Sequence, residues 1–218
     1  MSDSALKSGD AAVGASTKVR VVEEKLLSNN WYVLKATSFD LLRQDGTWQR
    51  QNRETYDRGN GATILLYNRA QKTVILTRQF RFPAFVNPRA GMPRGDVGHP
   101  SAKGMLIETC AGLLDQDDPV TCIQRETQEE TGYAISDVRQ VFEAYMSPGS
   151  VTERLFFFVG EYQAKDKLSA GGGHHHEGED IQVLEMQLDA ALALVDLGEI
   201  CDAKTIMLLQ YAKLHHLV

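Results

Sequence analysis

Several features that would define other classes of protein are missing from this chain of 218 residues. Its three cysteines, Cys110, Cys122 and Cys201, form no Cys-x-x-Cys pair, which argues against a disulfide framework and fits a reducing compartment. The formal net charge is −6 and no run of lysine and arginine occurs, so we expect no nucleic-acid partner. The N-terminus lacks the apolar core of a signal peptide, and no apolar run is long enough to span a bilayer. We therefore expect a cytoplasmic protein that has no membrane partner.

The first part of the sequence predicts a tail and a small β-sheet unit. Residues 1–16 are small and polar, which is typical of a disordered tail. Residues 17–58 predict three strands, with turns at Ser28-Asn29-Asn30 and at Asp45-Gly46. Three short strands do not bury a core by themselves. We therefore expect this arm to pack on the rest of the chain or on a second copy.

The remainder, residues 59–218, predicts one domain in which strands alternate irregularly with helices. Strands are expected over 62–68, 73–79, 105–110, 138–145, 155–162 and 181–186, and helices over 119–131, 188–197 and 202–216. Residues 82–104 are rich in proline and glycine and are expected to form a long irregular loop. The segment 111–115 is expected to lead from a strand into the first helix. This order predicts an α/β sandwich around a mixed sheet.

The first helix carries the most informative pattern in the sequence. Asp118-Pro119 is a typical helix start, and Gly132 is suited to a left-handed cap at the helix end. Between these points, Glu126, Glu129 and Glu130 lie at positions i, i+3 and i+4, so that all three carboxylates share one face. Like charges at this spacing repel each other. The face is therefore either solvated or a site for a hard cation such as Mg²⁺.

Single residues elsewhere leave two interpretations open. Arg78 and Arg81 are suited to hold a phosphate by a fork of hydrogen bonds or to form surface ion pairs. Trp31 is suited to stack on a base or to pack in its hairpin, and Lys204 to reach a phosphate or only solvent. The run His174-His175-His176 is favoured as a solvated loop over a metal site, because glycines flank it. We expect Asp202 to cap the last helix, and Cys110 and Cys122 to be buried.

The helix pattern belongs to a longer motif. The run Gly112-x5-Asp118-x6-Arg125-Glu126-Thr127-x-Glu129-Glu130-x-Gly132-Tyr133 resembles the Nudix box of pyrophosphohydrolases. Further segments are similar to the GDP-mannose pyrophosphatase branch of that family, namely 56–62, 78–81, 108–115, 145–149 and 170–173. The resemblance implies a Nudix-type α/β/α sandwich with a mixed β-sheet over 59–218, and an N-terminal arm over 17–58 that forms a homodimer.

The resemblance also implies an activity and a set of site residues. The activity is hydrolysis of a nucleotide sugar, GDP-mannose to GMP and mannose 1-phosphate, with Mg²⁺ as cofactor and Mn²⁺ as a possible substitute. The implied metal ligands are the main-chain carbonyl of Ala111 and the side chains of Glu126, Glu130 and Glu179. The implied substrate contacts are Trp31, Asn52, Arg53, Glu54, Arg81, Ala111, Gly112, Leu113, Glu130, Glu153, Gly178, Glu179 and Lys204.

Hydrolysis of a diphosphate also needs a group that accepts the proton of the attacking water. Glu179 is our first choice for this role and Glu129 the second, while Glu130 is expected to be essential to turnover; a loop surface charge is the alternative for Glu179. Arg125 is expected to pair with a neighbouring glutamate and orient it. Two other functions stay open. One is hydrolysis of ADP-ribose to AMP and ribose 5-phosphate. The other is a nucleotide-sugar sensor without turnover, motivated by Asp118 and Gly178 at positions where the family usually has a glutamate and an acidic residue.

Overall fold

The computed structural model describes residues 18–87, 104–174, 176 and 178–218, which form two compact units. The N-terminal unit consists of residues 18–58 together with Gly149–Thr152, and the body consists of the described residues of Gly59–Pro148 and Glu153–Val218. The predicted disordered tail, residues 1–16, lies outside the described residues. Each unit is described by itself below.

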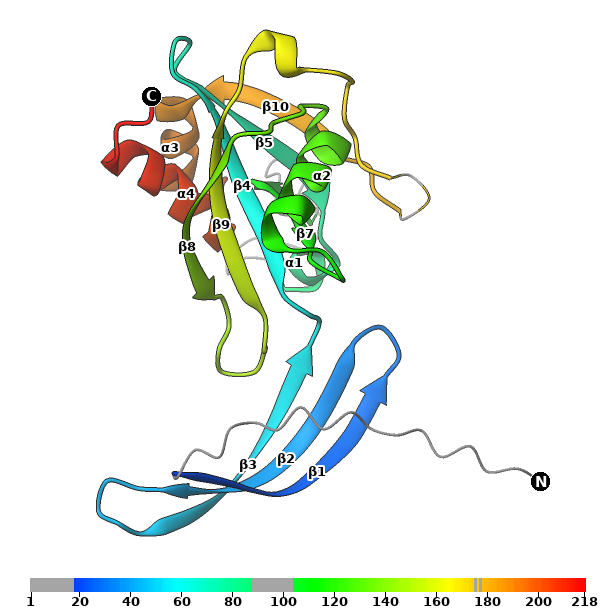
Figure 1. Cartoon of the computed structure of the whole chain (residues 1–218), viewed down its shortest axis with the longest axis vertical. Coiled ribbons are helices and arrows are strands. Elements are labelled where there is room, and N and C mark those ends of the chain that lie inside the picture. The colour runs from blue at the N-terminus through cyan, green and yellow to red at the C-terminus, as the bar shows by residue number, and fades with distance from the viewer. Residues whose placement is uncertain (1–17, 88–103, 175, 177) are drawn as a thin grey trace, which may run out of the picture. The chain divides into compact units, whose positions relative to one another are not determined.

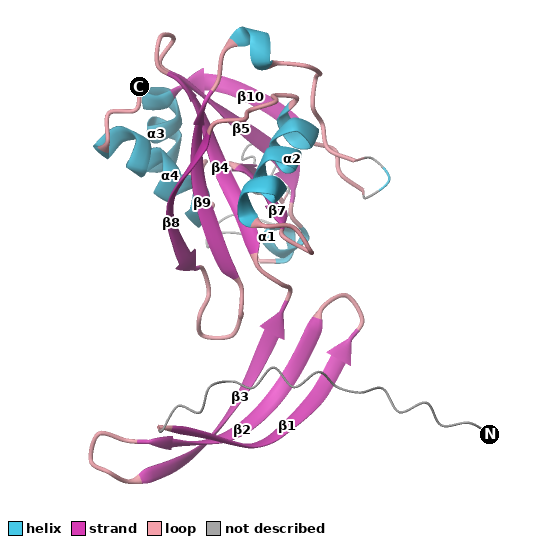
Figure 2. Ribbon diagram, viewed as in Figure 1, coloured by secondary structure: helices cyan, strands magenta, loops and turns pink. Residues whose placement is uncertain are grey.

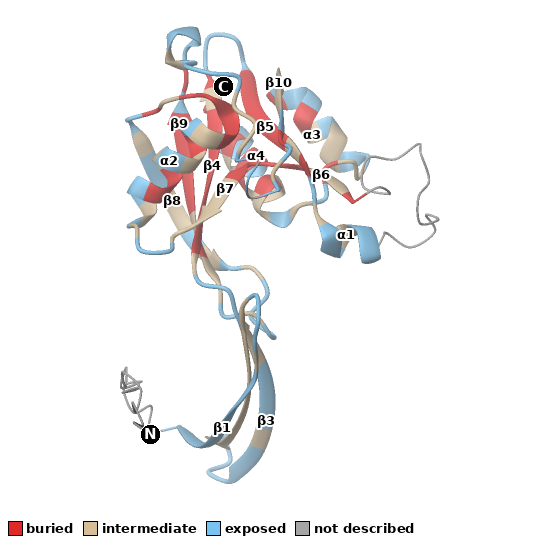
Figure 3. Ribbon diagram, turned by 90° about the vertical axis from the view of Figure 1, so that its right-hand side faces the viewer, coloured by how far each residue is buried: buried red, intermediate tan, exposed pale blue. Residues whose placement is uncertain are grey.

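The N-terminal unit is a three-stranded antiparallel sheet in the order β1-β2-β3 (Figure 2), with strands β1 Val19–Asn29, β2 Val33–Leu42 and β3 Trp48–Asp57. The predicted turn at Asp45-Gly46 is confirmed. Asp45 accepts hydrogen bonds from the amide of Thr47 at 3.0 Å and from its hydroxyl at 2.6 Å, and Gly46 has a φ of 80°. Within residues 18–58, every residue is exposed or of intermediate burial (Figure 3), so this sheet has no core of its own.

The body is built on a seven-stranded sheet in the order β10-β5-β4-β9-β8, in which β6 pairs with β5 and β7 pairs with β4. Only the β4–β9 pair is parallel among the described strand pairs, so the predicted mixed sheet is confirmed. The strands are β4 Gly61–Asn68, β5 Thr73–Phe80, β6 Met105–Glu108, β7 Cys110–Leu113, β8 Val138–Tyr145, β9 Arg154–Glu161 and β10 Gln182–Gln187. The helices are α1 Phe82–Val86, α2 Pro119–Thr131, α3 Leu188–Asp196 and α4 Ala203–Leu214, with a 3₁₀ turn, η2, at Ala164–Asp166.

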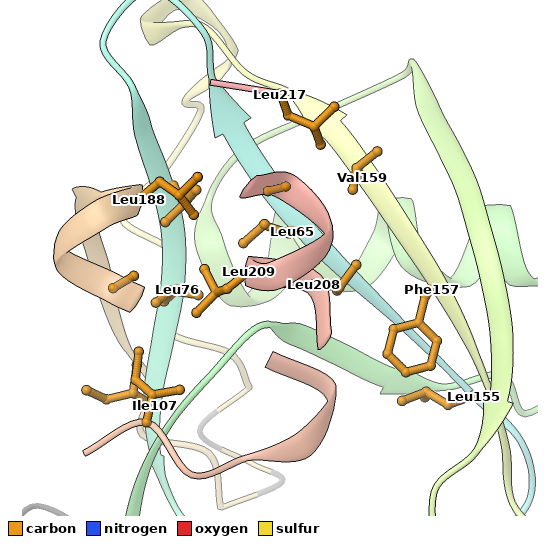
Figure 4. Packing of buried hydrophobic residues seen from close by; sticks show 14 residues of the cluster. Leu65, Leu76, Ile107, Leu155, Phe157, Val159, Leu188, Leu208, Leu209 and Leu217 are labelled. Atoms are coloured by element: carbon orange, nitrogen blue, oxygen red, sulfur yellow. The ribbon is translucent and has the colours of Figure 1, made fainter. Parts of the chain in front are cut away.

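Helices cover both faces of this sheet (Figure 1), as predicted for an α/β/α sandwich. Successive residues of a strand point to opposite faces. Leu65 of β4 accordingly packs in the cluster formed with α3 and α4, where Leu208 and Leu209 of α4 lie (Figure 4). The neighbouring Ile64 packs in the second cluster, with Ile123 of α2. The apolar strands therefore supply two cores, and α2 is fixed on the face opposite to α4.

The segment 105–113 differs from the prediction of one strand followed by a loop. It forms two short strands, because β6 pairs with β5 and β7 then pairs with β4. The chain changes partner at Thr109, whose side chain is fully buried. Its hydroxyl lies 2.9 Å from that of Thr63, and its amide donates to the hydroxyl of Thr205 at 2.7 Å. These buried threonines satisfy polar groups where strand pairing is interrupted.

The predicted loop over 82–104 is wrong at its beginning. Phe82–Val86 forms the short helix α1, with Pro83 in the first helical positions, where proline is tolerated. Residues 88–103 of the predicted loop lie outside the described residues. The other predicted strands and helices occur within one or two residues of their expected bounds. Among the described residues, no helix is both long and apolar enough to cross a membrane.

Candidate active site

Helix α2 holds the acidic stripe, and its ends are fixed as predicted. The carboxylate of Asp118 accepts hydrogen bonds from the amides of Val120 at 3.0 Å and Thr121 at 3.2 Å. Gly132 has a φ of 80° and donates its amide to the carbonyl of Gln128 at 3.0 Å. Both ends are therefore satisfied by local contacts, so Asp118 acts as a helix cap. The helix presents its glutamates from a rigid support.

The three glutamates of the stripe differ in burial. The side chains of Glu129 and Glu126 are 25% and 15% exposed, whereas Glu130 is only 2% exposed. Burial raises the pKa of Glu130 to about 8, opposed by hydrogen bonds from Cys110 and Ala111 and reinforced by the charges of Glu126 and Glu179. Burial also raises the pKa of Glu126. The solvated alternative is therefore wrong for Glu130.

Strand β7 lies directly against the stripe. The amide of Ala111 donates to Oε2 of Glu130 at 3.3 Å. At Gly112 a Cβ atom would overlap the carboxylate of Glu126, so only glycine lets this side chain rest on the strand backbone. At Thr109 the chain changes its pairing from β5 to β4, and this change brings the backbone of 110–113 beside the carboxylates of Glu126 and Glu130.

The glycine run Gly171-Gly172-Gly173 fixes the loop that carries Glu179. The amide of Gly172 donates to the carbonyl of Glu130 at 2.9 Å, and that of Gly173 to the carbonyl of Glu129 at 3.1 Å. These bonds satisfy carbonyls at the end of α2 that lack helical partners. A Cβ atom on Gly173 would overlap the Glu179 carboxylate, which accepts the amide of His174 at 2.8 Å. The loop thereby brings Glu179 to the stripe, where its charge raises the pKa of Glu126 and of Glu130.

Both carboxylate oxygens of Glu129 have side-chain partners. Nη1 of Arg125 lies 3.1 Å from Oε2 of Glu129 and 3.0 Å from Oε1 of Glu126, which confirms the expected pairing of this arginine. Nε2 of His174 lies 3.3 Å from Oε1 of Glu129. His174 is thus attached to the stripe by this contact. His175 lies outside the described residues.

The arrangement suits a hard cation that draws part of its coordination from elsewhere. Within the described residues, no three histidine, cysteine, aspartate or glutamate side chains converge closely enough to hold a metal ion by themselves. Mg²⁺ commonly takes only one or two carboxylates and completes its coordination with water and substrate phosphates. A buried carboxylate whose neighbours are also acidic gains most from such a cation. Glu126 and Glu130 of α2 are the groups suited to hold it, and a part of Glu179 and of the carbonyl of Ala111 in the coordination stays a prediction.

A second buried carboxylate, Glu108, binds two of the predicted substrate contacts. Nε and Nη2 of Arg81 lie 2.8 and 3.1 Å from its two oxygens, and Nζ of Lys204 also donates to it. Nζ of Lys204 lies 3.0 Å from Oδ2 of Asp202, which caps α4 as predicted. The solvent alternative for Lys204 is wrong, because its side chain is 12% exposed. Arg81 forms an ion pair, but with a buried partner rather than the predicted surface one, and its role in phosphate binding stays a prediction.

The other predicted contacts are spread over the chain. In the body, Glu153 lies beside Gly61 at the start of β4, and Gly178 has a φ of 81° next to Glu179. In the N-terminal unit, Trp31 is 83% exposed and contacts Tyr32 edge-on, at 6.1 Å between ring centroids, so the ring is packed in its hairpin only in part. Asn52 accepts the hydroxyl of Ser38 at 2.6 Å, and the unit also carries Arg53 and Glu54. A role of these residues in substrate binding stays a prediction.

The structure also gives the surroundings of Arg78, Glu108 and Cys110. Nε of Arg78 is buried and has no hydrogen-bond partner among the described residues. Sequence reasoning missed Glu108 as a buried counter-ion and Cys110 as a hydrogen-bond donor to Glu130. The signal available for Glu108 was a carboxylate within the apolar run Met105-Leu106-Ile107. Cys110 and Cys122 are buried as predicted, whereas Cys201 is exposed.

Two family models match this chain. The model of the NUDIX domain matches residues 57–208. The model described as the GDP-mannose pyrophosphatase NudK N-terminal domain matches residues 18–56. The two matches together extend over both units of the structure.

Curated relatives align with most of the chain. A GDP-mannose pyrophosphatase of Pectobacterium atrosepticum is 54% identical over 197 residues, which cover 90% of this chain and 95% of that protein. One of Citrobacter koseri is 51% identical over 196 residues, with the same coverage. One of Escherichia coli O157:H7 is 49% identical over 201 residues, covering 92% of this chain and 98% of that protein.

Proposed function

The chain belongs to the Nudix family of hydrolases, and from this premise we propose that it hydrolyses the diphosphate linkage of GDP-mannose to GMP and mannose 1-phosphate. The proposed substrate rests on the relatives, which bear the name GDP-mannose pyrophosphatase at about half identity over at least 90% of the chain. The observation that carries the reaction class is Glu130, a carboxylate that is 2% exposed and whose pKa is raised by burial and by the charges of Glu126 and Glu179. This residue needs a cation, and a diphosphate needs the same cation.

We propose Mg²⁺ as that cation, with Mn²⁺ as a substitute, because the donors are oxygens. Glu126, Glu130, Glu179 and the carbonyl of Ala111 would hold it. When bound, a divalent cation supplies charge neutralisation for the diphosphate and makes an attacking water more acidic. The chain itself supplies the fixed geometry, through the helix caps, Gly112 and the glycine run.

The proposed proton acceptor is Glu179, with Glu129 as second choice. Arg125 and His174 occupy the two carboxylate oxygens of Glu129, which leaves this residue tied to its own helix and to the loop. Glu179 accepts a backbone hydrogen bond at Oε2 and lies on a loop that follows three glycines. A carboxylate in this position is suited to take a proton from water beside the diphosphate. Glu130 remains the residue whose charge the site most depends on.

The substrate contacts proposed in the body are Arg81, Lys204, Glu153, Gly178 and the backbone of 111–113. Arg81 offers a planar cation that matches a phosphate. The contacts proposed in the N-terminal unit are Trp31, Asn52, Arg53 and Glu54. The 83% exposed ring of Trp31 supports stacking on a base.

We also propose a homodimer in which the N-terminal unit lies at the interface. Residues 18–58 contain no buried residue, and several large apolar side chains of this unit are exposed: Val19, Val21, Val22, Leu26, Leu27, Trp31 and Trp48. Exposed apolar surface of this kind is typical of an interaction site. Light scattering at micromolar concentration is expected to give the mass of two chains, and a monomer would reject the proposal.

A cytoplasmic location completes the proposal. It is supported by the three cysteines, which form no Cys-x-x-Cys pair and fit a reducing compartment.

A panel of nucleotide sugars assayed with Mg²⁺ tests the substrate. We expect GMP and mannose 1-phosphate from GDP-mannose, with a kcat/KM at least tenfold above that for ADP-ribose. A higher value for ADP-ribose would favour that alternative substrate. Binding of GDP-mannose without any product would favour the sensor alternative.

A further inference from the structure

Glu108 is a buried carboxylate that the proposed reaction does not use directly. It is 2% exposed and lies at the end of β6. Isolated burial of a carboxylate is costly unless cations and hydrogen bonds compensate its charge. Here Arg81 and Lys204 both compensate it, and the pKa of Glu108 is lowered to about 2 although burial alone would raise it. Glu108 is therefore ionised whenever the protein is folded at neutral pH.

The two cations of Glu108 are unequal in their access to solvent. The side chain of Lys204 is 12% exposed and also contacts Asp202, whereas the side chain of Arg81 is 40% exposed. Charges alternate along the series Asp202, Lys204, Glu108 and Arg81. Arg81 is thus the exposed end of the series, where a positive charge is available to an anionic ligand.

The contact between Glu108 and Arg81 fixes the orientation of the guanidinium group. Two parallel hydrogen bonds, at 2.8 and 3.1 Å, engage Nε and Nη2. A guanidinium group has five N–H donors in one plane. Among the described residues, no other side chain accepts a hydrogen bond from Arg81. The remaining donors therefore have a direction that Glu108 sets.

Glu108 is itself held by its backbone. Its carbonyl accepts the hydroxyl of Thr77 at 3.3 Å, and the next amide, that of Thr109, donates to Thr205 at 2.7 Å. Lys204 and Thr205 are adjacent in α4, so one helix end holds both the side chain and the backbone of this segment. The same segment continues into β7, which contacts Glu130. Burial lowers the pKa of Arg81, but the hydrogen bonds and charge of Glu108, followed by the charge of Glu130, raise it.

We infer that Glu108 is a positioning residue, which orients the guanidinium group of Arg81 toward the diphosphate of the substrate, with Lys204 as the internal counter-ion that keeps Glu108 charged. The inference rests on the proposed function for the identity of the ligand. Its chemistry requires only a nucleoside diphosphate group within reach of Arg81. Glu108 does not touch the reacting atoms and acts through Arg81.

A double-mutant cycle tests this role. Glu108→Gln keeps the size of the side chain and removes its charge, so the KM for GDP-mannose is expected to rise on the order of tenfold with a smaller change in kcat. In an Arg81→Gln background, the same change at Glu108 is expected to alter KM less than about twofold, because its effect passes through Arg81 while Lys204 keeps its pairing with Asp202 at 3.0 Å. An equal rise of KM in both backgrounds would overturn the inference.

Further variants separate positioning from simple structural support. Glu108→Asp keeps the charge and moves the carboxylate by one methylene group, so only part of the wild-type KM is expected to return; full recovery would overturn the orienting role. If Glu108→Gln fails to fold, Arg81→Lys is used instead, because lysine keeps the positive charge but cannot form the two parallel hydrogen bonds to Glu108. An unchanged KM in Arg81→Lys would then overturn the inference. As control, Asp189→Asn breaks an exposed pair with Lys213 and is expected to leave KM unchanged.

Failure of the proposed function would be recognised separately. Wild-type protein is assayed first, and absence of GDP-mannose turnover would reject the proposed activity alone. The Kd for GDP is then measured by calorimetry for wild type, Glu108→Gln, Arg81→Gln and the double variant. A rise on the order of tenfold on Glu108→Gln that disappears in the Arg81→Gln background supports the inference. An unchanged Kd, or no binding of GDP by the wild type, overturns it.

Discussion

Glu108 belongs to the segment 105–113 and Glu130 accepts a hydrogen bond from the same segment, and each of the two glutamates is 2% exposed. Their chemical states are opposite. The pKa of Glu108 is lowered to about 2, because Lys204 and Arg81 outweigh the effect of burial. The pKa of Glu130 is raised to about 8 by burial and by the nearby charges of Glu126 and Glu179. Equal burial therefore has opposite consequences for the two carboxylates.

The difference separates a carboxylate whose charge is balanced by its own chain from one that we propose binds a cation. Glu108 has its counter-ions within the chain and serves to hold them in place. Around Glu130 the chain supplies an amide, a thiol and further carboxylates, and the pKa of Glu130 stays raised although its charge also interacts with Arg81. We propose that a proton or a bound cation balances the charge of Glu130. The predictions below test this contrast, from the largest expected effect to the smallest.

The metal-free protein is expected to lose stability as the pH rises. The folded state keeps a proton on Glu130 up to a pKa of about 8, whereas the unfolded chain releases it near 4.5. The stabilisation is thus complete below the unfolded pKa and is lost as pH rises toward the folded pKa, by about 5 kcal/mol in total. Urea unfolding in EDTA measures this decline. Glu130→Gln should remove it, as should saturating Mg²⁺, and an identical decline in wild type and variant would contradict the contrast.

Glu130→Gln is also expected to abolish most turnover. The amide keeps the size of the side chain but no longer carries a charge for a cation, so kcat should fall on the order of a thousandfold, or about 4 kcal/mol. Steady-state release of GMP measures it. Glu143→Gln is the matched control, since Glu143 pairs with Arg154 at the surface. A loss of less than tenfold in Glu130→Gln would mean that the site does not depend on this carboxylate.

Glu108 should give the opposite pH dependence. Its lowered pKa contributes stability above the unfolded value of 4.5, and this contribution is lost as pH falls toward about 2. The total is about 3 kcal/mol. The difference in free energy of unfolding between wild type and Glu108→Gln, followed from pH 6 to pH 3, is expected to shrink steadily on acidification. A constant difference over this range would show that the charge of Glu108 is not what stabilises the fold.

Gly112→Ala should disturb the site of Glu130 and leave that of Glu108 intact. The added methyl group would overlap the carboxylate of Glu126 and displace it, so kcat/KM should fall about a hundredfold, which is about 3 kcal/mol. Gly149→Ala is the control, because a Cβ atom there meets nothing within 4 Å. Unchanged activity in Gly112→Ala would show that Glu126 is not required where the structure has it.

The fold was largely predictable where local rules decide it. Caps at Asp118 and Gly132 fixed the bounds of α2, and the turn at Asp45-Gly46 fixed the hairpin of β2 and β3. The division of 105–113 into two strands was not predictable, because it depends on a change of partner from β5 to β4 at Thr109. Helix α1 was missed for a related reason: the prolines and glycines around it indicated a loop, whereas Phe80, Phe82 and Phe85 pack together there.

The sequence by itself determined the acidic stripe, since helix periodicity alone puts Glu126, Glu129 and Glu130 on one face. Tertiary structure decided which of them is buried, and brought Glu179 to them through the glycine run. It alone decided the partners of Glu108, which are 27 and 96 residues away in the chain. Sequence spacing fixes the geometry within a helix, but burial and charge compensation depend on segments that meet only when the chain folds.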